Sequence, residues 1–182
     1  MMKLLRNRKV AWFITILVIA FSVVIVGGSK LAKEAESVEA VFEQGVKLDG
    51  MSIAHDLARS ADIAYNYYTV ARRYMAEETP ALVELLAARS DLLSAERIED
   101  KSEAQQRLTE AVVTLYGQLA DYSLNERDLA YRESLLAELR SANAIMEHDG
   151  YNDLARDFNR LREGWPAKLI ALLYGVEPLA YF

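Results

Sequence analysis

The sequence predicts an all-α protein, in which a single N-terminal transmembrane helix is followed by an elongated antiparallel four-helix bundle with a short C-terminal helix. Nineteen successive residues near the start carry no charge, and beyond them apolar residues recur at the three- and four-residue spacing of helices. Only three prolines and eight glycines interrupt the chain, and no segment alternates as a strand would. We therefore expect a basic tail over residues 1–9, a transmembrane helix over 10–28 and a helical domain over 29–182.

The uncharged run "VAWFITILVIAFSVVIVGG" has the length and composition of a membrane span. At about 1.5 Å per residue it reaches roughly 28 Å, close to the ~30 Å thickness of a bilayer's hydrocarbon core. A cleaved signal peptide is the alternative, because a basic start and an apolar run also describe one. The run is longer than the usual ~7–15 apolar residues of a signal peptide, and no Ala-x-Ala site closely follows Gly28. We therefore expect a signal-anchor that stays attached.

Basic residues flank the two ends of this run unequally. Four precede it and two directly follow it, namely Lys3, Arg6, Arg8 and Lys9, then Lys30 and Lys33. Since cytoplasmic flanks carry the excess of Lys and Arg, the bias predicts a cytoplasmic start and a domain outside the cytoplasm.

The bundle is predicted from apolar stripes and capping residues. A long helix beginning near Asp49 carries one stripe, which includes Tyr68, and Thr79 before Pro80 predicts a restart or a kink. Capping boxes at Ser102 and Ser123, with Gln105 and Glu126 three residues later, predict two further helix starts.

The last of these helices is expected to run from about Leu124 towards Glu163, with a heptad stutter between Met146 and Leu154. Residues 30–47, continuing from the span, supply the remaining helix of the bundle.

The chain ends on the apolar stretch "GWPAKLIALLYGVEPLAYF". Gly164 and Pro166 predict a sharp turn, after which residues 166–182 are expected to form a flap. Its apolar side chains would pack on the bundle; they are Leu169, Ile170, Leu172 and Leu173. An interfacial membrane helix is the alternative, favoured by Trp165, Lys168 and Tyr174.

Residues 151–182 contain a set of spaced aromatic, amide and proline residues. The set consists of Tyr151 and Asn152, Phe158 and Asn159, Trp165 and Pro166, and Pro178 with Tyr181 and Phe182. In this order and spacing it resembles the end of LemA-family proteins. The resemblance implies a helical bundle on a membrane anchor in the bacterial inner membrane, with a poorly defined molecular function and a domain often described as cytoplasmic.

The resemblance is looser over residues 38–97, where "DLARSADIAYNYYTV" lacks a proline that the family usually has. Family logic also suggests that Asn152 and Asn159, seven residues apart on one helix face, are buried amides that fix helix register.

Composition and motifs exclude several function classes. Beyond the first nine residues the chain has 17 basic and 27 acidic residues, which argues against nucleic-acid binding. Without cysteine there is no thiolate ligand or cysteine nucleophile. His55 and His148 lack metal-ligand spacing, and no catalytic or phosphate-binding motif occurs. We expect no cofactor, no metal and no enzymatic activity.

Two function classes remain. The first is a membrane-tethered interaction or scaffold module, with Tyr65, Tyr67 and Tyr74 as its candidate surface. The alternative for this cluster is that Tyr68 lies in the core and the other three are half-buried at helix contacts. The module's candidate partners are the membrane, other membrane or envelope proteins and a second copy of this chain. The second is a ligand or divalent-cation sensor, or a hydrolase, that uses carboxylates between helices, namely Glu147, Asp149, Asp153 and Asp157.

Overall fold

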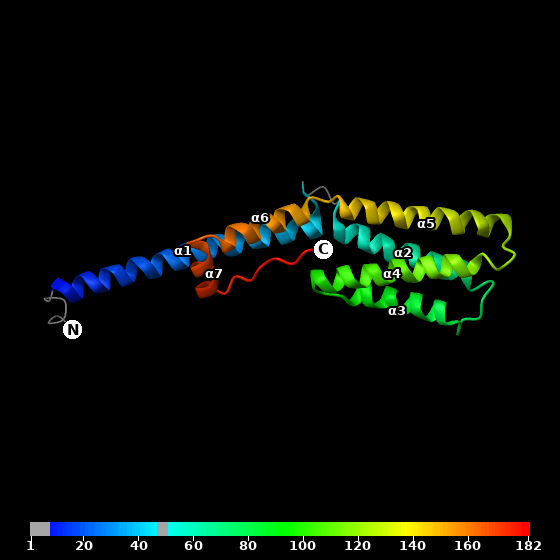
Figure 1. Cartoon of the computed structure of the whole chain (residues 1–182), viewed down its shortest axis with the longest axis horizontal. Coiled ribbons are helices and arrows are strands. Elements are labelled where there is room, and N and C mark those ends of the chain that lie inside the picture. Colours follow the sequence, from blue (N-terminus) through cyan, green and yellow to red (C-terminus); the bar gives the residue numbers. More distant parts are fainter. Residues whose placement is uncertain (1–7, 47–50) are drawn as a thin grey trace. The chain divides into compact units, whose positions relative to one another are not determined.

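The computed structural model describes residues 8–46 and 51–182, and these residues form helices and no strand. The helices are α1 (Arg8–Gln44), α2 (Ile53–Ala71), α3 (Pro80–Ser94), α4 (Ile98–Leu119), α5 (Glu126–Glu147), α6 (Tyr151–Glu163) and α7 (Ala167–Tyr174) (Figure 1). The all-α prediction is confirmed for this part of the chain.

The chain divides into two compact units. The described residues of the first unit are 8–39 and 153–179, and those of the second are 40–46, 51–152 and 180–182. The helices α1 and α6 and the C-terminal tail each pass from one unit into the other.

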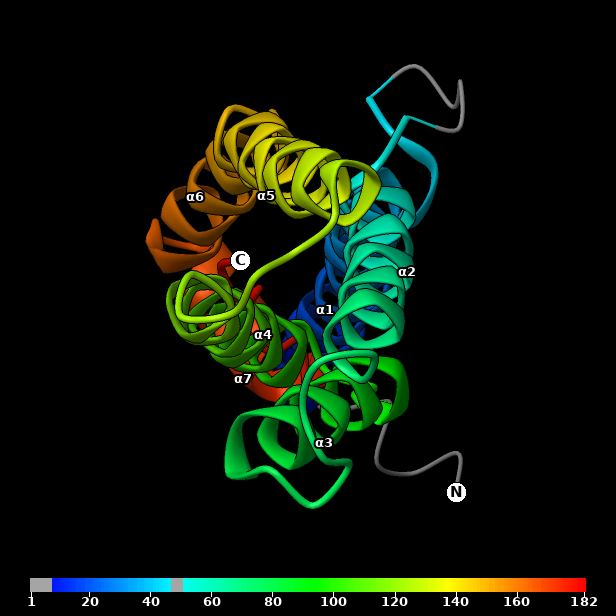
Figure 2. The ribbon, with the colours of Figure 1, turned by 90° about the vertical axis from the view of Figure 1, so that its right-hand side faces the viewer.

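The second unit contains the packed helices α2 to α5. Helix α2 contacts α3, α4 and α5, while α3 contacts α4. The end-on view in Figure 2 shows α2 between α5 and α3. Helices α4 and α5 approach each other least of the neighbouring pairs. The side of the unit between α4 and α5 is therefore its most open side.

Two predicted long helices are each divided in the structure. The first ends at Ala71 and restarts at Pro80 as α3, which packs back against α2. Pro80 has no N–H to continue the preceding hydrogen-bond ladder, so it can only begin a helix here. The predicted helix from Leu124 to Glu163 is interrupted after Glu147. This interruption replaces the expected stutter, and the predicted start near Asp49 lies outside the described residues.

Both predicted capping boxes are wrong in position. Helix α4 begins at Ile98, so Ser102 lies inside its first turns, and α5 begins after Asn125. The Asn125 side chain accepts a hydrogen bond from the backbone N–H of Asp128 and caps α5 in place of Ser123. Asn is as good an N-cap as Ser, so the sequence offered two competing caps within three residues.

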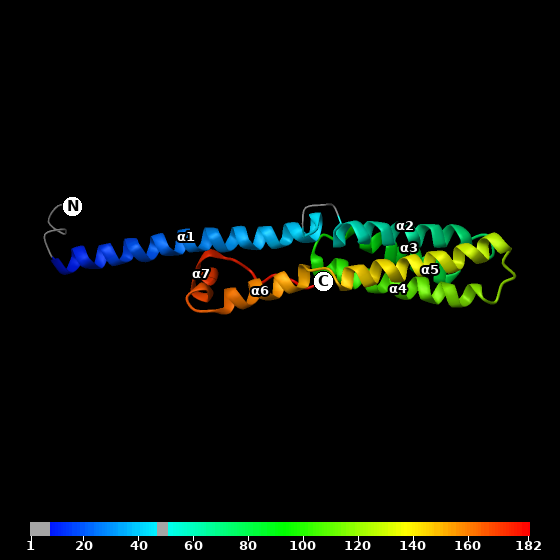
Figure 3. The same cartoon turned by 90° about the horizontal axis from the view of Figure 1, so that it is seen from above.

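In the first unit, α7 packs against α1 at two adjacent glycines (Figure 3). A Cβ added at Gly27 would lie 3.0 Å from Ile170, and one at Gly28 would lie 2.2 Å from the Tyr174 ring. Ring atoms next to the backbone cannot move aside, so Gly28 permits the close approach of the two helices. The pair Gly27–Gly28, at the end of the uncharged run, is therefore a helix contact.

The predicted packing of α7 is largely wrong. Leu169, Leu172 and Leu173 are 52%, 78% and 61% exposed, and only Ala171 of this helix is buried. A helix of eight residues has one face against α1, taken by Ile170 and Tyr174, so the leucines on other faces remain uncovered.

The tail after α7 is the part of the C-terminus that packs. Gly175 adopts the left-handed conformation (φ 79°) and ends α7. Val176 and Leu179 beyond it are buried. Phe182 makes an edge-to-face ring contact with Phe42, with centroids 5.7 Å apart.

Two asparagine side chains hold the backbone of this tail. Asn159 donates through Nδ2 to the Leu179 carbonyl (2.8 Å) and accepts from the Leu179 N–H (2.8 Å). Asn152 makes the same pair of bonds with Phe182, each at 2.9 Å. The Tyr151 hydroxyl donates to the Ala180 carbonyl, and Arg162 donates to the Val176 carbonyl.

The spacing of the two asparagines fits this role. Seven residues of helix advance about 10.5 Å, and three residues of extended chain advance about 10 Å. Asn152 and Asn159 on a helix therefore match Phe182 and Leu179 on an extended tail. The expectation that these amides fix helix register is wrong, because their partners are the tail backbone.

We expect Asn152→Ala and Asn159→Ala each to lower the free energy of unfolding by about 1–3 kcal/mol. Each change removes two hydrogen bonds worth about 0.5–1.5 kcal/mol apiece. Urea midpoints of the detergent-solubilised full chain, followed by far-UV circular dichroism, measure the effect. Asn66→Ala, on an exposed position of α2, is the matched control and should change little. Equal midpoints for all three variants would contradict the assignment.

Candidate functional site

Helices α4 and α5 border an open groove with a volume of about 520 Å³. Most of its lining side chains are polar, and Met146 is the buried apolar one. The lining residues are Ser102, Gln105, Gln106, Thr109 and Glu110 from α4, Asn143, Met146 and Glu147 from α5, and Asn152 and Phe182. The groove is thus closed at one end by Asn152 and by the last residue of the tail, which Asn152 binds.

A chain of hydrogen bonds runs across this groove. Gln105 Nε2 donates to Ser60 Oγ (3.1 Å) and to Asn143 Oδ1 (2.7 Å). Asn143 Nδ2 in turn donates to Thr109 Oγ1 (3.0 Å). This network joins α4 to α2 on one side and to α5 on the other.

The direction of these bonds is fixed by two hydroxyl groups. Ser60 Oγ donates to the Asp56 carbonyl and Thr109 Oγ1 donates to the Gln105 carbonyl, so both hydroxyls can only accept from the amides. Asn143 must then turn its Nδ2 to Thr109 and its Oδ1 to Gln105. Gln105 therefore contributes its Nε2 to the network, and its Oε1 takes no part in it.

The remaining oxygen of Gln105 has no hydrogen-bond partner in the described part of the chain. Gln105 is only 5% exposed, and its Oε1 is a buried acceptor. An unpaired buried acceptor costs about 1–3 kcal/mol. Gln105 lines the groove, while this oxygen itself lies beneath the groove surface.

The groove also favours donors electrostatically. Glu110 and Glu147 line it and are exposed. A ligand carrying amide N–H or ammonium groups complements this site better than an anion would.

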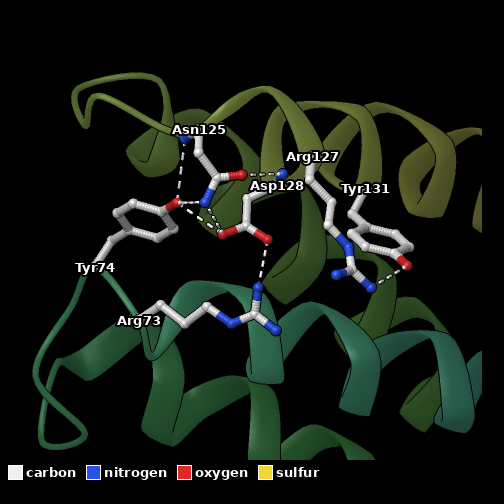
Figure 4. A network of polar contacts seen from close by, with 6 residues as sticks. All are labelled: Arg73, Tyr74, Asn125, Arg127, Asp128 and Tyr131. Atoms are coloured by element: carbon white, nitrogen blue, oxygen red, sulfur yellow. Dashed lines mark hydrogen bonds and ion pairs between the residues drawn. The ribbon is translucent and has the colours of Figure 1, made fainter.

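A second polar network lies at the turn after α2 and is complete in itself (Figure 4). The buried carboxylate of Asp128 accepts from Arg73, from the Tyr74 hydroxyl (2.7 Å) and from Asn125 Nδ2 (2.9 Å). Beside it, Arg127 donates to the Tyr131 hydroxyl. The Asp128 network joins the α2–α3 connection to the start of α5. Because both oxygens of its carboxylate accept hydrogen bonds within the protein, we interpret this network as structural.

The three predicted surface tyrosines lie in different environments. Tyr65 is 49% exposed, stacks on Tyr68 and lies under the guanidinium of Arg89. Tyr74 is half-buried in the Asp128 network. Tyr67 is fully buried, its hydroxyl donates to the Arg132 carbonyl (3.0 Å), and burial raises its pKa.

The prediction for Tyr67 is wrong, since its side chain belongs to the core, while Tyr68, expected in the core, is half-buried.

The family-motif residues mostly serve the tail. Tyr151 and Phe158 are buried, and Tyr151 contacts the Phe42 ring edge-to-face. Trp165 is 87% exposed and Pro166 caps α7. Asn152, Asn159 and Phe182 take part in the tail contacts. Pro178 and Tyr181 are exposed.

The carboxylates that were predicted to act together between helices make separate contacts. Asp149 accepts from the N–H of Tyr151 at the start of α6, and Asp153 and Asp157 pair with Arg156 and Arg160 one turn on. Within residues 8–46 and 51–182, no three His, Cys, Asp or Glu side chains are grouped to hold a metal ion. Of the two histidines, His148 ends α5 and His55 is exposed.

Gln105 is the residue that sequence reasoning missed. Its position three residues after Ser102 made it the partner in a capping box, whereas it lies mid-helix and buried. The sequence does contain a signal that Gln105 is buried. It lies three residues before Leu108 and seven before Val112, which places it on the buried face of α4.

Comparison with protein families matches residues 50–182 to the LemA family. The match includes the stretch up to residue 97 where the resemblance was loose. Comparisons with curated proteins and with solved structures give no match.

Gln105→Met tests whether this side chain is kept for stability. The change removes two donated bonds but also removes the unpaired acceptor, so we expect the free energy of unfolding to change by less than about 1 kcal/mol. Urea unfolding measures it, and Gln106→Met on the exposed rim is the control. A loss several times larger would show that the network itself requires Gln105.

Asp128→Ala should lower the free energy of unfolding by about 2–3 kcal/mol, because it removes three hydrogen bonds to a buried carboxylate, one of them from the charged Arg73. Glu126→Ala, in the same first turn of α5 but exposed, is the control and should cost below about 1 kcal/mol. Thermal unfolding of both variants measures the difference, and similar losses would contradict the structural role of Asp128.

Proposed function

Because the chain belongs to the LemA family, we propose that it is a membrane-anchored, non-enzymatic helical-bundle protein that acts as an interaction or scaffold module at the bacterial cell envelope. The bundle of α2 to α5 would present the α4–α5 groove to a segment of another membrane or envelope protein, or of a second copy of the chain.

The anchor rests on the character of α1. This helix is long and apolar enough to span a membrane, and its most apolar window is not buried by any other element. Trp12, Phe13 and Phe21 are each more than 60% exposed. A core helix of a soluble domain would cover such side chains, whereas lipid covers them in a membrane span.

The observation that carries the interaction role is the open, mostly polar α4–α5 groove. Among the described residues the buried Gln105 Oε1 beside it has no donor, and a partner segment would supply one from a backbone N–H, an amide or a lysine once the Gln105 side chain shifts towards the groove. Glu110 and Glu147 on the rim favour the same donors.

A small-molecule sensor is the second candidate function. The groove volume of about 520 Å³ lies in the range of small-ligand sites, which is about 300–1,000 Å³. A free amino acid or amine would pair with Gln105 and the two rim carboxylates. The open form of the groove favours an extended peptide segment.

Fractionation tests the anchor and its orientation. After alkaline carbonate extraction the full chain should remain in the membrane pellet, because residues 10–28 are not cleaved. Protease added to intact spheroplasts should digest the domain if it lies outside the cytoplasm. A soluble form starting near Ser29 would contradict the anchor, and full protection would place the domain in the cytoplasm.

Photo-crosslinking in cells tests the groove. A benzoylphenylalanine at Gln106, on the groove rim, should give a defined crosslinked product, whereas one at Tyr65 should not. Glu110→Lys together with Glu147→Lys should abolish the product by reversing the charge of the rim, and Glu103→Lys, exposed on the same helix, should leave it unchanged. Products from Tyr65 alone would move the interface to the tyrosine surface, and products from neither position would contradict the interaction role.

A further inference from the structure

Helix α7 presents an apolar face that no described element covers. Trp165 is 87% exposed just before the helix, and Leu169, Leu172 and Leu173 are more than half exposed. These positions recur at three- and four-residue spacing and lie away from Ile170 and Tyr174, which contact α1. Large exposed apolar side chains gathered on one short helix mark a contact surface.

The place where α7 touches α1 indicates what covers this face. The contacts are at Gly27 and Gly28, the last two residues of the uncharged run. Both helices belong to the first unit at this point, so α7 is fixed in depth relative to the run. If α1 spans the bilayer, its uncharged end lies where hydrocarbon meets the headgroups, and α7 lies at the same level.

The side chains around α7 are of the types found at the boundary between hydrocarbon and headgroups. Lys30 and Lys33 are exposed on α1 directly after the contact, and Lys168 is exposed on α7, where it pairs with Glu163. Lysines at this level are attracted by anionic lipid headgroups. Trp and Tyr are enriched at the boundary between hydrocarbon and headgroups, and Trp165 and Tyr174 frame α7 on both sides.

We propose that α7 is an interfacial membrane helix, which lies in the headgroup–hydrocarbon boundary with Trp165, Leu169, Leu172 and Leu173 in contact with lipid. The inference rests on the proposed membrane anchor. Its consequence is that the protein touches the bilayer twice, once through the span and once through α7. This second contact holds α6 and the tail, which precede and follow α7, next to the membrane surface.

The two tryptophans of the chain allow a direct test, since one lies in the predicted span and the other just before α7. The full chain is reconstituted into vesicles of phosphatidylcholine and phosphatidylglycerol that carry brominated acyl chains. Trp12→Phe leaves Trp165 as the only tryptophan, and Trp165→Phe leaves Trp12; excitation at 295 nm avoids the tyrosines. Quenching by bromine near the headgroup is compared with quenching by bromine near the chain end.

We expect Trp165 to lose most of its emission, and more with shallow than with deep bromine. Leu172→Glu in the Trp12→Phe background should reduce this quenching severalfold, because it places a charge in the lipid contact. Leu93→Glu, on an exposed leucine of α3, is the matched control and should leave quenching unchanged. Circular dichroism of each variant verifies that its helices are retained.

Two results would overturn the inference and leave the anchor standing. One is a Trp165 that no brominated lipid quenches while Trp12 is quenched, which would mean that another protein or a second copy covers the face. The other is a Trp165 quenched most by deep bromine, which would mean insertion into the hydrocarbon core. A Trp12 that is not quenched would instead overturn the proposed anchor itself, and the inference with it.

Discussion

The pairing of two asparagine side chains with the backbone of the C-terminal tail is the constraint on which much of this structure depends. A chain end without regular secondary structure leaves its N–H and C=O groups unpaired, and burying such groups is costly. Asn152 and Asn159 each supply one donor and one acceptor, as a neighbouring strand would. This pairing lets Val176 and Leu179 be buried and brings the Phe182 ring against Phe42.

The same pairing connects the functional features. In the second unit, Phe182 held by Asn152 closes one end of the α4–α5 groove. In the first unit, Arg162 and Asn159 hold the tail just beyond α7, so that α7 is fixed at both ends while it packs on Gly27 and Gly28. The aromatic and amide residues of the family motif are spaced along the sequence, but most of them act together to hold the C-terminal tail.

The two polar networks of the second unit differ in whether their buried acceptors have hydrogen-bond donors. Asp128 has three donors for its carboxylate and ties the α2–α3 connection to α5, which is a stability role. Gln105 is also buried, but among the described residues its Oε1 has no donor, and the residue lines an open groove. The proposed partner in the groove would supply that donor.

The sequence by itself determined the helical class, the apolar run of α1, the start of α3 at Pro80 and membership of the family, because these depend on local composition and periodicity. It could not place the helix starts after Arg97 and Asn125, since Ser102 and Ser123 offered competing capping boxes a few residues away. Only the tertiary structure decided that Tyr67 is buried in place of Tyr68, which depends on which neighbouring helices approach α2. Likewise, the sequence indicated that the apolar end of the chain must be covered, but not by what. The tertiary structure decided that the tail beyond Gly175 packs while the leucines of α7 do not, because one short helix can turn only one face towards α1.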